Sequence, residues 1–472
     1  MLRKPPGGDL RGAPATSNAR TPIVPIAGYN AGMRKAWKRG PHGAGSATTV
    51  LAVERLAAGG DGVGRIDAKV AFAPRTAPGD VVEVEVVEER RSWCRARMIR
   101  LVTPGPDRIT PHCPAFGDCG GCDWQHLAYP AQLAAKRSIV EDALRRIGRL
   151  HPPAVTPTIP SPLEHGYRHR ARMHTARRGQ AAQFGFFRRG SHDVVPLEAC
   201  PVLHPSLNVV LGALAVAGRV QPRAFAHCGQ VCLDTGWDGA TARLLLRGME
   251  DKPLNISEPA ASALRDAAAV SGVRLLLGDE TREPLPLGPG PQALVTTGEA
   301  FTQVNLRQNL KLVEVALDLA APVPGEEILD LCCGLGNLAV PAAARGGRVT
   351  GVDIDGEAVR QARENAGRLG FEATFVRDDA AAAARALAGA GRRFTLVLLN
   401  PPRTGAREAA SIVPSLAPLR IVVVSCDPAT LARDASVLAA AGYALEVVRP
   451  IDLFPQTAHV ETVTLFRLKR AP

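Results

Sequence analysis

The sequence is poor in aromatic residues, at 4% of 472 residues, and no run of about 18 apolar residues occurs in it. The missing apolar run argues against a membrane-spanning helix. Residues 1–47 are rich in proline, glycine and arginine and lack the continuous apolar stretch of a secretory signal. We therefore expect residues 1–47 to form a disordered basic extension, and we expect a cytoplasmic protein with no membrane partner.

The ten cysteines have no secretion signal to accompany them. In a long chain of this kind, thiols are more often metal ligands or catalytic groups than partners in disulfides. Three of them, Cys113, Cys119 and Cys122, are spaced C-x5-C-x2-C in the stretch HCPAFGDCGGCDWQH. The spacing indicates a metal site that still needs a fourth ligand from elsewhere.

Positive charge is in excess, with 57 Lys and Arg against 45 Asp and Glu and a net charge of +12. An excess of this sign favours a polyanionic partner such as nucleic acid. The alternative is that a gene rich in G and C has raised the arginine content without any functional reason.

The hydrophobic pattern divides the rest of the chain into three regions. Residues 48–104 alternate with a period of two, as in VVEVEVVEE, which predicts a small β-barrel of a kind often used to bind RNA, or used only for packing. Residues 105–300 predict a central α+β domain, in which the arginines of YRHRARMHTARR either face solvent or line a groove for phosphates. In residues 301–472 strands alternate with helices, which predicts a parallel, doubly wound, Rossmann-like sheet.

The third region begins with features of a nucleotide-derived ligand site. A buried strand runs into the turn C-G-L-G-N, where Gly334 and Gly336 allow the backbone to approach a ligand closely. Asp353 ends the next strand, in a position suited to a ribose hydroxyl pair. Because the turn is not G-x-G-x-x-G, it favours S-adenosylmethionine over a nicotinamide dinucleotide. Asn400, followed by two prolines, ends a later strand and can hydrogen-bond a planar heterocycle.

Two further residues predict covalent chemistry. Cys426 follows an apolar strand and precedes a helix, where a thiol is expected to have a lowered pKa and to act as a nucleophile. A small buried structural residue is the alternative. Glu461 stands in an apolar strand, where an inward carboxyl would have a raised pKa and suit a general base, and a solvent-facing Glu is the alternative. The pair indicates thiol addition to a pyrimidine C6, methylation at C5 and removal of the C5 proton.

From residue 49 to the C-terminus the motifs CPAFGDCGGCDWQHL, FTQVNLRQN, DLCCGLGN, NPPRTG, SCDPATLARD and DLFPQTAHVE occur in order, and this set resembles the RNA 5-methyluridine methyltransferases. A TRAM-like barrel together with the cysteine cluster is similar to the 23S rRNA branch of that family. The resemblance implies that Cys200 is the fourth ligand and that four thiolates hold a [4Fe-4S] cluster, with zinc as the chemical alternative. It also implies an enzyme that acts as a monomer on 23S rRNA.

The resemblance assigns roles residue by residue. It implies Cys426 as nucleophile and Glu461 as base, and S-adenosylmethionine contacts from Gln303, Cys332, Asn337, Asp353, Asp379 and Asn400. Asn400 replaces the Asp of the family's D-P-P-R, and Asp427 replaces the Asn of its S-C-N-P. Two alternatives remain, a tRNA methyltransferase with the same chemistry and a non-catalytic RNA-binding assembly factor, and the retained Cys426 and Glu461 argue against the second.

Overall fold

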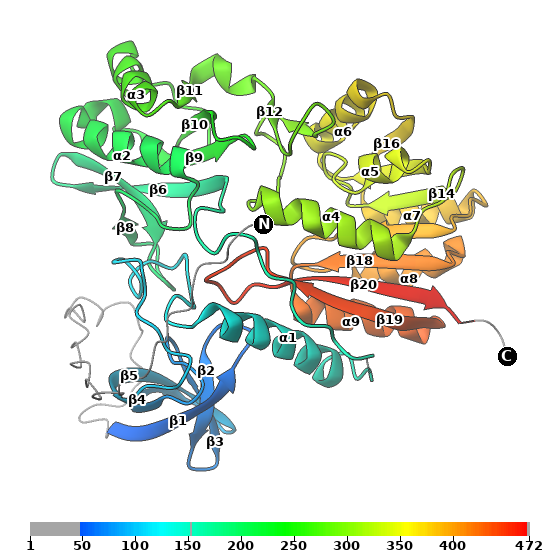
Figure 1. The fold of residues 1–472 in the computed structure, drawn as a ribbon, viewed down its shortest axis with the longest axis horizontal. Helices are drawn as coiled ribbons and strands as arrows, with labels where there is room; N and C mark the ends of the chain where they lie inside the picture. Colours follow the sequence, from blue (N-terminus) through cyan, green and yellow to red (C-terminus); the bar gives the residue numbers. More distant parts are fainter. Residues whose placement is uncertain (1–47, 152, 470–472) are drawn as a thin grey trace, which may run out of the picture. The chain divides into compact units, whose positions relative to one another are not determined.

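The computed structural model describes residues 48–151 and 153–469, and the predicted basic extension lies outside them. All described residues belong to one compact unit, residues 43–472. At its start, the described chain closes five strands into a barrel in the order β1-β2-β3-β5-β4 (Figure 1). The barrel strands are β1 Thr48–Leu56, β2 Gly62–Ile66, β3 Lys69–Ala73, β4 Val81–Glu89 and β5 Trp93–Thr103.

The predicted alternation along β4 is confirmed. Val82 and Val84 are fully buried in the barrel core, whereas Glu83 lies on the outer face and pairs across the strands with Arg100 at 3.1 Å. Opposite charges facing each other across strands stabilise a sheet modestly. They also neutralise part of the positive charge on the outer face of the barrel.

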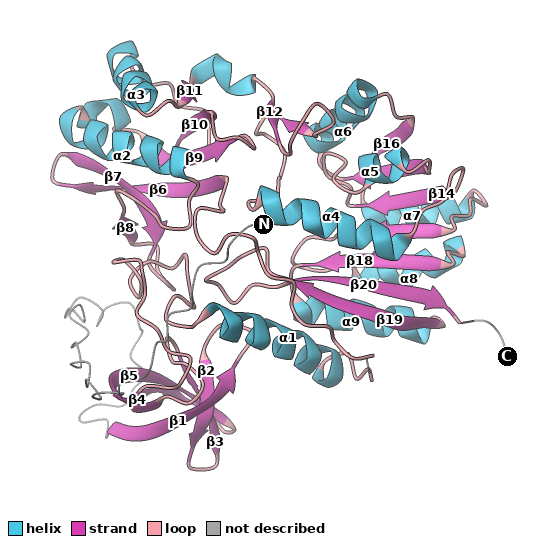
Figure 2. Ribbon diagram, viewed as in Figure 1, coloured by secondary structure: helices cyan, strands magenta, loops and turns pink. Residues whose placement is uncertain are grey.

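Helix α1, Tyr129–Arg146, follows the cysteine-rich segment, and the next described part is a six-stranded sheet in the order β11-β10-β9-β6-β7-β8. Helices α2, Pro205–Val220, and α3, Glu258–Val270, cover one face of this sheet (Figure 2). The remaining bounds are β6 Arg170–Arg178, β7 Ala181–Phe187, β8 Val194–Pro196, η2 Pro222–Phe225, β9 Cys228–Thr235, β10 Thr241–Gly248, β11 Arg274–Leu276, η3 Gly278–Arg282, β12 Leu285–Pro286 and β13 Val295–Thr296.

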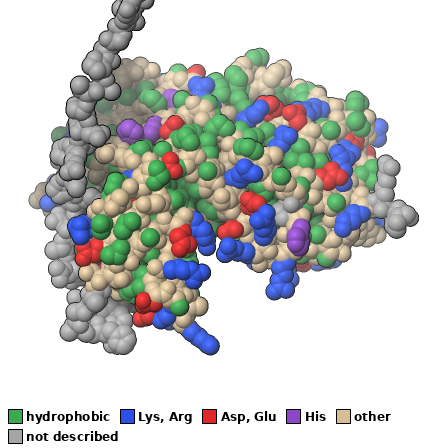
Figure 3. Space-filling model, turned by 60° about the horizontal axis from the view of Figure 1, so that its bottom comes forward, with side chains coloured by type: hydrophobic (Ala, Val, Ile, Leu, Met, Phe, Trp, Pro, Cys, Tyr) green, Lys and Arg blue, Asp and Glu red, His purple; other side chains and the backbone are tan. Residues whose placement is uncertain are grey.

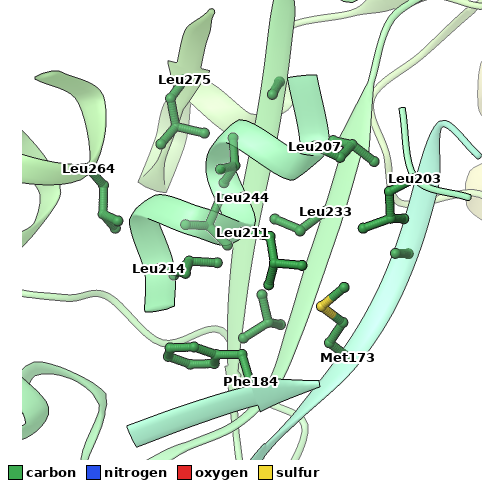
Figure 4. Packing of buried hydrophobic residues seen from close by; sticks show 14 of the residues in the cluster. Met173, Phe184, Leu203, Leu207, Leu211, Leu214, Leu233, Leu244, Leu264 and Leu275 are labelled. Carbon is green, nitrogen blue, oxygen red and sulfur yellow. The ribbon is translucent and has the colours of Figure 1, made fainter. Parts of the chain in front are cut away.

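Leucines of α2 form the centre of this second core. Leu207, Leu211 and Leu214 point toward Met173 of β6 and Phe184 of β7, and all five side chains are buried (Figure 4). Burying a side chain of this size contributes about 1.5–3 kcal/mol. Since neighbouring side chains alternate along a strand, Arg170 and Arg172 of β6 lie on the face opposite Met173. Arg177 lies on the same face as Met173, near the end of the strand, and donates to the carbonyl of Ala226.

The last sheet of the described chain has seven strands in the order β16-β15-β14-β17-β18-β20-β19. Its strands are β14 Glu327–Leu331, β15 Arg348–Asp353, β16 Ala373–Arg377, β17 Leu396–Leu399, β18 Arg420–Ser425, β19 Tyr443–Ile451 and β20 Glu461–Leu468. Its helical segments are α4 Leu306–Ala320, α5 Ala339–Ala344, α6 Gly356–Leu369, α7 Ala380–Gly389, α8 Arg407–Ile412, η4 Val413–Leu416 and α9 Pro428–Ala440.

Helices cover both faces of this sheet. Residues of α4, α5 and α6 share one core with the strands, and residues of α1, α7, α8 and α9 share the other. The strand order reverses between β14 and β17, and in open α/β sheets ligands bind outside the carboxyl ends of the strands at such a point. The predicted helices on two faces are therefore present, and the reversal marks the edge at which a ligand is expected.

The expectation of an entirely parallel sheet is wrong at one edge. β20 runs antiparallel to both of its neighbours, β18 and β19. The reason is the short connection of residues 452–460, because a parallel return needs a crossover of a dozen or more residues. None of the helices that the structure describes combines the length and apolar character that a membrane crossing requires.

Candidate active site

The ends of β18 and β20 bring the two predicted catalytic side chains together. In the antiparallel pair, Ser425 lies opposite Thr462. Cys426, directly after β18, therefore lies beside Glu461, the first residue of β20. The negative charge of Glu461 contributes to a raised pKa of the Cys426 thiol, as expected for neighbours. The antiparallel return of β20 is thus what assembles this pair.

Asp427 explains how the chain turns from Cys426 into α9. Its Oδ1 accepts hydrogen bonds from the N–H groups of Ala429, at 2.9 Å, and Thr430, at 2.8 Å, and Pro428 begins the helix. Asp and Asn are about equally good N-caps, and proline is favoured in the first turn. The departure from the S-C-N-P motif therefore preserves the local structure around Cys426.

The expected lowering of the Cys426 pKa is wrong for the protein without substrate. Burial raises the pKa of the thiol to about 11, and the charges of Glu461 and Asp427 add to this, while Arg403 opposes it. Burial and the charges of Glu461 and Asp427 therefore outweigh the lowering of the pKa that the nearby helix N-terminus predicts.

Glu461 has the environment that was predicted for a general base. Its side chain is 2% exposed, and burial raises its pKa to about 7, with the charge of Arg403 partly opposing that rise. A carboxyl with a pKa near neutrality can exist as carboxylate and still accept a proton readily.

Arg403 is a neighbour that the sequence argument quoted in N-P-P-R and left without a role. It is exposed, and its charge lowers the pKa of both Cys426 and Glu461. The signal was its position three residues after Asn400, at the carboxyl end of β17. A fixed cation at this place can stabilise a thiolate and negative charge on a substrate.

The glycine turn after β14 has strained and crowded backbone. Cys332 adopts φ +62°, a left-handed conformation that is uncommon outside glycine. Gly336 has φ +95°, and a Cβ atom there would lie 2.6 Å from Cγ2 of Val340. The backbone N–H of Gly334 donates to Oδ2 of Asp353 at 2.8 Å. The turn is therefore tied to the end of β15, as a shared ligand site requires.

Acidic groups gather around Cys332. Burial raises the pKa of its thiol to about 12, and the charges of Asp353, Asp330 and Asp379 add to the rise. Asp379 also caps α7, because its Oδ1 accepts from the N–H groups of the helix's first turn. Asp330, in β14, was missed: it is fully buried, and burial together with Asp353 raises its pKa well above its usual range.

The other three predicted contacts differ in their surroundings. Asn337 forms a reciprocal amide pair with Asn309 of α4, with N–O distances of 2.8 and 3.0 Å. Asn400 lies at the end of β17, where its N–H donates to the carbonyl of Leu331 at 3.2 Å, next to Cys332. Gln303 instead lines a small cavity of about 10 Å³, whose other walls come from the ends of β6 and β9, from β12 and β13 with their flanking residues, and from the start of α4.

All ten cysteines lie in the described residues and are free thiols. The three of the C-x5-C-x2-C stretch lie in an irregular loop, residues 113–125, which we name the cysteine loop. The N–H of Gly120 donates to the carbonyl of Phe187 at 2.9 Å and holds this loop against the end of β7. The loop therefore has a fixed place beside the central sheet.

The four predicted cluster ligands influence one another electrostatically. Burial raises the pKa of Cys119 to about 11, that of Cys122 to about 12 and that of Cys200, and charges on other members of the set add to each rise. A metal that binds these thiols would have to displace their protons. In the described parts of the chain, however, no three His, Cys, Asp or Glu side chains are arranged to hold a metal ion.

On the face seen in Figure 3, Lys and Arg side chains lie along the lower edge, with Asp and Glu beside several of them. Across the described residues, many opposite charges form ion pairs, such as Arg189 with Asp61 at 2.9 Å and Arg100 with Glu83 at 3.1 Å. The net charge of +12 is thus partly neutralised by neighbours, although an overall attraction to a polyanion remains.

Two family models match the sequence. A TRAM domain matches residues 45–99, which include the barrel strands up to most of β5, and a methyltransferase domain matches residues 328–408, from β14 to the start of α8. The fold and site thus define a methyltransferase that carries a TRAM domain at its N-terminal side.

Relatives along the whole chain narrow this class. The 23S rRNA (uracil(1939)-C(5))-methyltransferase of Azoarcus sp. (strain BH72) is 37% identical over 88% of this chain and 98% of its own. The enzyme of the same name from Alkalilimnicola ehrlichii is 36% identical over 88% and 96%. An uncharacterised RNA methyltransferase of Thermosynechococcus vestitus is 36% identical over 91% and 98%. The chain belongs to the RNA uracil-C5 methyltransferase family, and the resemblance found in its motifs is confirmed.

A solved structure shares the fold. The tRNA (uracil-54, C5)-methyltransferase of Pyrococcus abyssi, determined with S-adenosyl-L-homocysteine, superimposes with a TM-score of 0.65 over 89% of this chain and all of that one. The two sequences are 23% identical, so this likeness concerns the fold alone.

Proposed function

We propose that this protein transfers a methyl group from S-adenosylmethionine to C5 of a uridine in 23S rRNA and produces 5-methyluridine. The observation that carries the proposal is the Cys426 thiol beside the buried Glu461 carboxyl, at paired strand ends of a methyltransferase fold. The named relatives act on uracil 1939, so the corresponding position is the first one to map.

Cys426 and Glu461 divide the reaction between them. The Cys426 thiol gives its proton to solvent and the thiolate adds to C6 of uracil, so that the electron pair of the C5–C6 double bond makes C5 nucleophilic. C5 takes the methyl group from the sulfonium donor, and S-adenosylhomocysteine is released. The Glu461 carboxylate then removes the C5 proton, the double bond forms again, and the C6–S bond breaks to return Cys426 as thiolate.

Arg403 has the position to support these charge changes. Its guanidinium favours the thiolate of Cys426, which burial otherwise disfavours, and it can stabilise negative charge on the uracil ring after thiol addition. Because substrate would cover this site, the attraction would strengthen as water leaves.

S-adenosylmethionine supplies the electrophilic methyl group, and the residues at the reversal of strand order fit it. The crowded turn at Gly336, the left-handed Cys332 and the carboxyl of Asp353 surround the carboxyl ends of β14 and β15. We assign S-adenosylmethionine binding to these residues together with Asp379 and Asn400. We also assign it to Asn337, whose amide would first have to leave Asn309, and to Gln303, from the small cavity that it lines. Asn400 keeps an acceptor oxygen where the family motif has Asp, without its charge.

The same proposal includes a [4Fe-4S] cluster on four thiols, Cys113, Cys119, Cys122 and Cys200. The donor set is suitable, because all four are thiols and their charges act on one another, as those of neighbouring groups do. Among the described residues, no group of three possible ligands is close enough to hold a metal ion. This finding argues more strongly against zinc than against a cluster, because a single ion draws its four ligands closer together. Such a cluster would have a structural role.

The test is methyl transfer by the purified full chain, prepared without oxygen, from labelled S-adenosylmethionine to unmodified 23S rRNA and to unmodified tRNA. Label in 5-methyluridine from 23S rRNA is expected, and none with Cys426→Ala. Label in tRNA alone would move the function to the tRNA alternative. No label in either RNA, from protein that binds both, would favour the non-catalytic assembly factor. The monomeric state and the cytoplasmic location remain predictions.

A further inference from the structure

The segment that leads into Glu461, residues 452–460, is held in place by contacts from other parts of the chain. We name it the base loop, because it connects β19 to the proposed base at the start of β20. Gln456, near its middle, adopts φ +70°, which is uncommon for a residue other than glycine. A conformation of this kind persists only where surrounding groups stabilise it.

Gln132 of α1 makes the most specific contact to the base loop. Its Nε2 donates to Oε1 of Gln456 at 3.0 Å, and its Oε1 accepts from the backbone N–H of Gln456 at 2.9 Å. Its Nε2 also lies within hydrogen-bond distance of the carbonyls of Trp124 and Leu127. Gln132 is fully buried, so these bonds are not exchanged for water. The amide thus fixes the strained residue of the loop on both its backbone and its side chain.

Lys136, one helical turn later, holds the beginning of the base loop. Its Nζ lies 2.5 Å from Oδ1 of Asp452, with both side chains fully buried, and it donates to the carbonyl of Phe454 at 3.0 Å. A buried ion pair is seldom more stabilising than apolar residues of the same volume, so its value lies in the geometry that it imposes.

The cysteine loop completes the enclosure. The N–H groups of Asp123 and Trp124 donate to the carbonyl of Gln456 at 3.0 and 2.9 Å. In return, Oδ2 of Asp123 accepts from the N–H of Ala458 at 3.3 Å. The base loop is therefore held at Asp452, Phe454, Gln456 and Ala458, by side chains of α1 and by the backbone and one carboxylate of the cysteine loop.

We propose that Gln132 and Lys136 are positioning residues for Glu461: through the base loop they place its carboxyl for removal of the C5 proton. The inference rests on the proposed function. In that reaction the base acts only after methyl transfer, whereas Cys426 is placed separately, by β18 and the cap of α9. Loosening the base loop should therefore slow removal of the C5 proton and leave methyl transfer unchanged.

The test follows the full chain with Gln132→Leu and Lys136→Met through a single turnover with labelled S-adenosylmethionine and 23S rRNA. Two quantities are measured, methyl transferred in total and the fraction of methylated RNA still bound covalently to protein in denaturant. We expect total transfer to change less than about twofold and release to slow by about tenfold to 100-fold, the size of effect that a misplacement of about 1 Å can have. The ratio counts only molecules that have transferred a methyl group, so unfolded protein does not affect it.

Tyr443→Phe is the matched control. The hydroxyl of Tyr443 donates to the carbonyl of Pro418 at 2.8 Å from a buried site at the other end of β19, opposite Leu468 instead of Glu461. It should lower stability without changing the covalent fraction. Gln132→Glu keeps an acceptor for the N–H of Gln456 but loses the donor to its Oε1, so it should also slow release, and it replaces Gln132→Leu if that variant does not fold.

The outcomes separate the two proposals. Suppose that the wild type gives 5-methyluridine, while in the two variants methyl transfer and product release fall together and the covalent fraction equals that of Tyr443→Phe. This result would overturn the positioning role alone. Wild-type protein that transfers no methyl group would overturn the proposed function, and the positioning role with it.

Discussion

Burial acts on both catalytic side chains in the direction that favours their neutral forms. It brings the pKa of Glu461 to about 7 and that of Cys426 to about 11, and the charge of Glu461 adds to the rise at Cys426. Arg403 is the neighbour that opposes both effects. The site therefore begins with a neutral thiol and a carboxyl poised near neutrality, and substrate binding has to complete its activation.

Replacing the base should separate methyl transfer from release. With Glu461→Gln, Cys426 can still add to C6 and C5 can still accept the methyl group, but no carboxylate removes the C5 proton. We expect a methylated protein–RNA adduct that survives denaturant and a rate of product release lower by at least about 100-fold. Gel mobility of labelled RNA measures the adduct. Normal turnover by this variant would assign the base to another group.

The same substitution should change the pH dependence of stability. The pKa of Glu461 rises from 4.5 to about 7 on folding, so its contribution is fully present below pH 4.5 and is lost as pH rises through 7. The difference corresponds to about 3 kcal/mol. The free energy of unfolding, measured with denaturant below pH 4.5 and above pH 7, should therefore show a relative gain for Glu461→Gln. Its stability minus that of wild type should be greater by about 3 kcal/mol at the higher pH. An equal difference at both pH values would contradict the buried, ionisable state.

At the level of elements, a glycine of the turn between β14 and α5 can be compared with a glycine of helix α6. Gly336→Ala places a methyl group 2.6 Å from Val340 in a left-handed conformation, and we expect a loss of about 1–3 kcal/mol in stability and weaker S-adenosylmethionine binding. Gly367→Ala, in exposed α6 with open space around its Cβ, should be neutral or stabilise by about 0.5–1 kcal/mol. Calorimetric titration with S-adenosylmethionine and thermal unfolding measure both. Equal affinity in the two variants would remove the turn from the binding site.

The pairing of elements also decides what local patterns can predict. The glycine turn, the strand before Cys426 and the apolar strand of Glu461 were recognisable because their residue types and spacing are local. The antiparallel place of β20 was not, since it depends on which strand it pairs with across the sheet. The buried Lys136 was missed for a similar reason: on the helix it resembles any solvent-facing lysine, and only Asp452, far along the chain, makes its burial possible.

At the scale of the whole molecule, the proposed cluster would join two segments that are distant in sequence, the cysteine loop before α1 and Cys200 before α2. A cross-link that closes a long loop stabilises a protein by roughly 2–4 kcal/mol through the unfolded state. The cysteine loop also donates hydrogen bonds to Gln456 in the base loop. Loss of the cluster should therefore lower both global stability and the order of the base loop.

Cys200→Ala tests this linkage against Cys232→Ala, a partly exposed cysteine of β9 in the same central sheet. We expect wild type and Cys232→Ala, purified without oxygen, to contain iron and acid-labile sulfide in equal amounts, and Cys200→Ala to lose both together with about 2–4 kcal/mol of stability. Hydrogen exchange should then quicken at the amides of the base loop, because their partners in the cysteine loop are less firmly held. Zinc without sulfide in the wild type would replace the cluster by the tetrahedral alternative, and an unchanged iron content in Cys200→Ala would remove that residue from the ligand set.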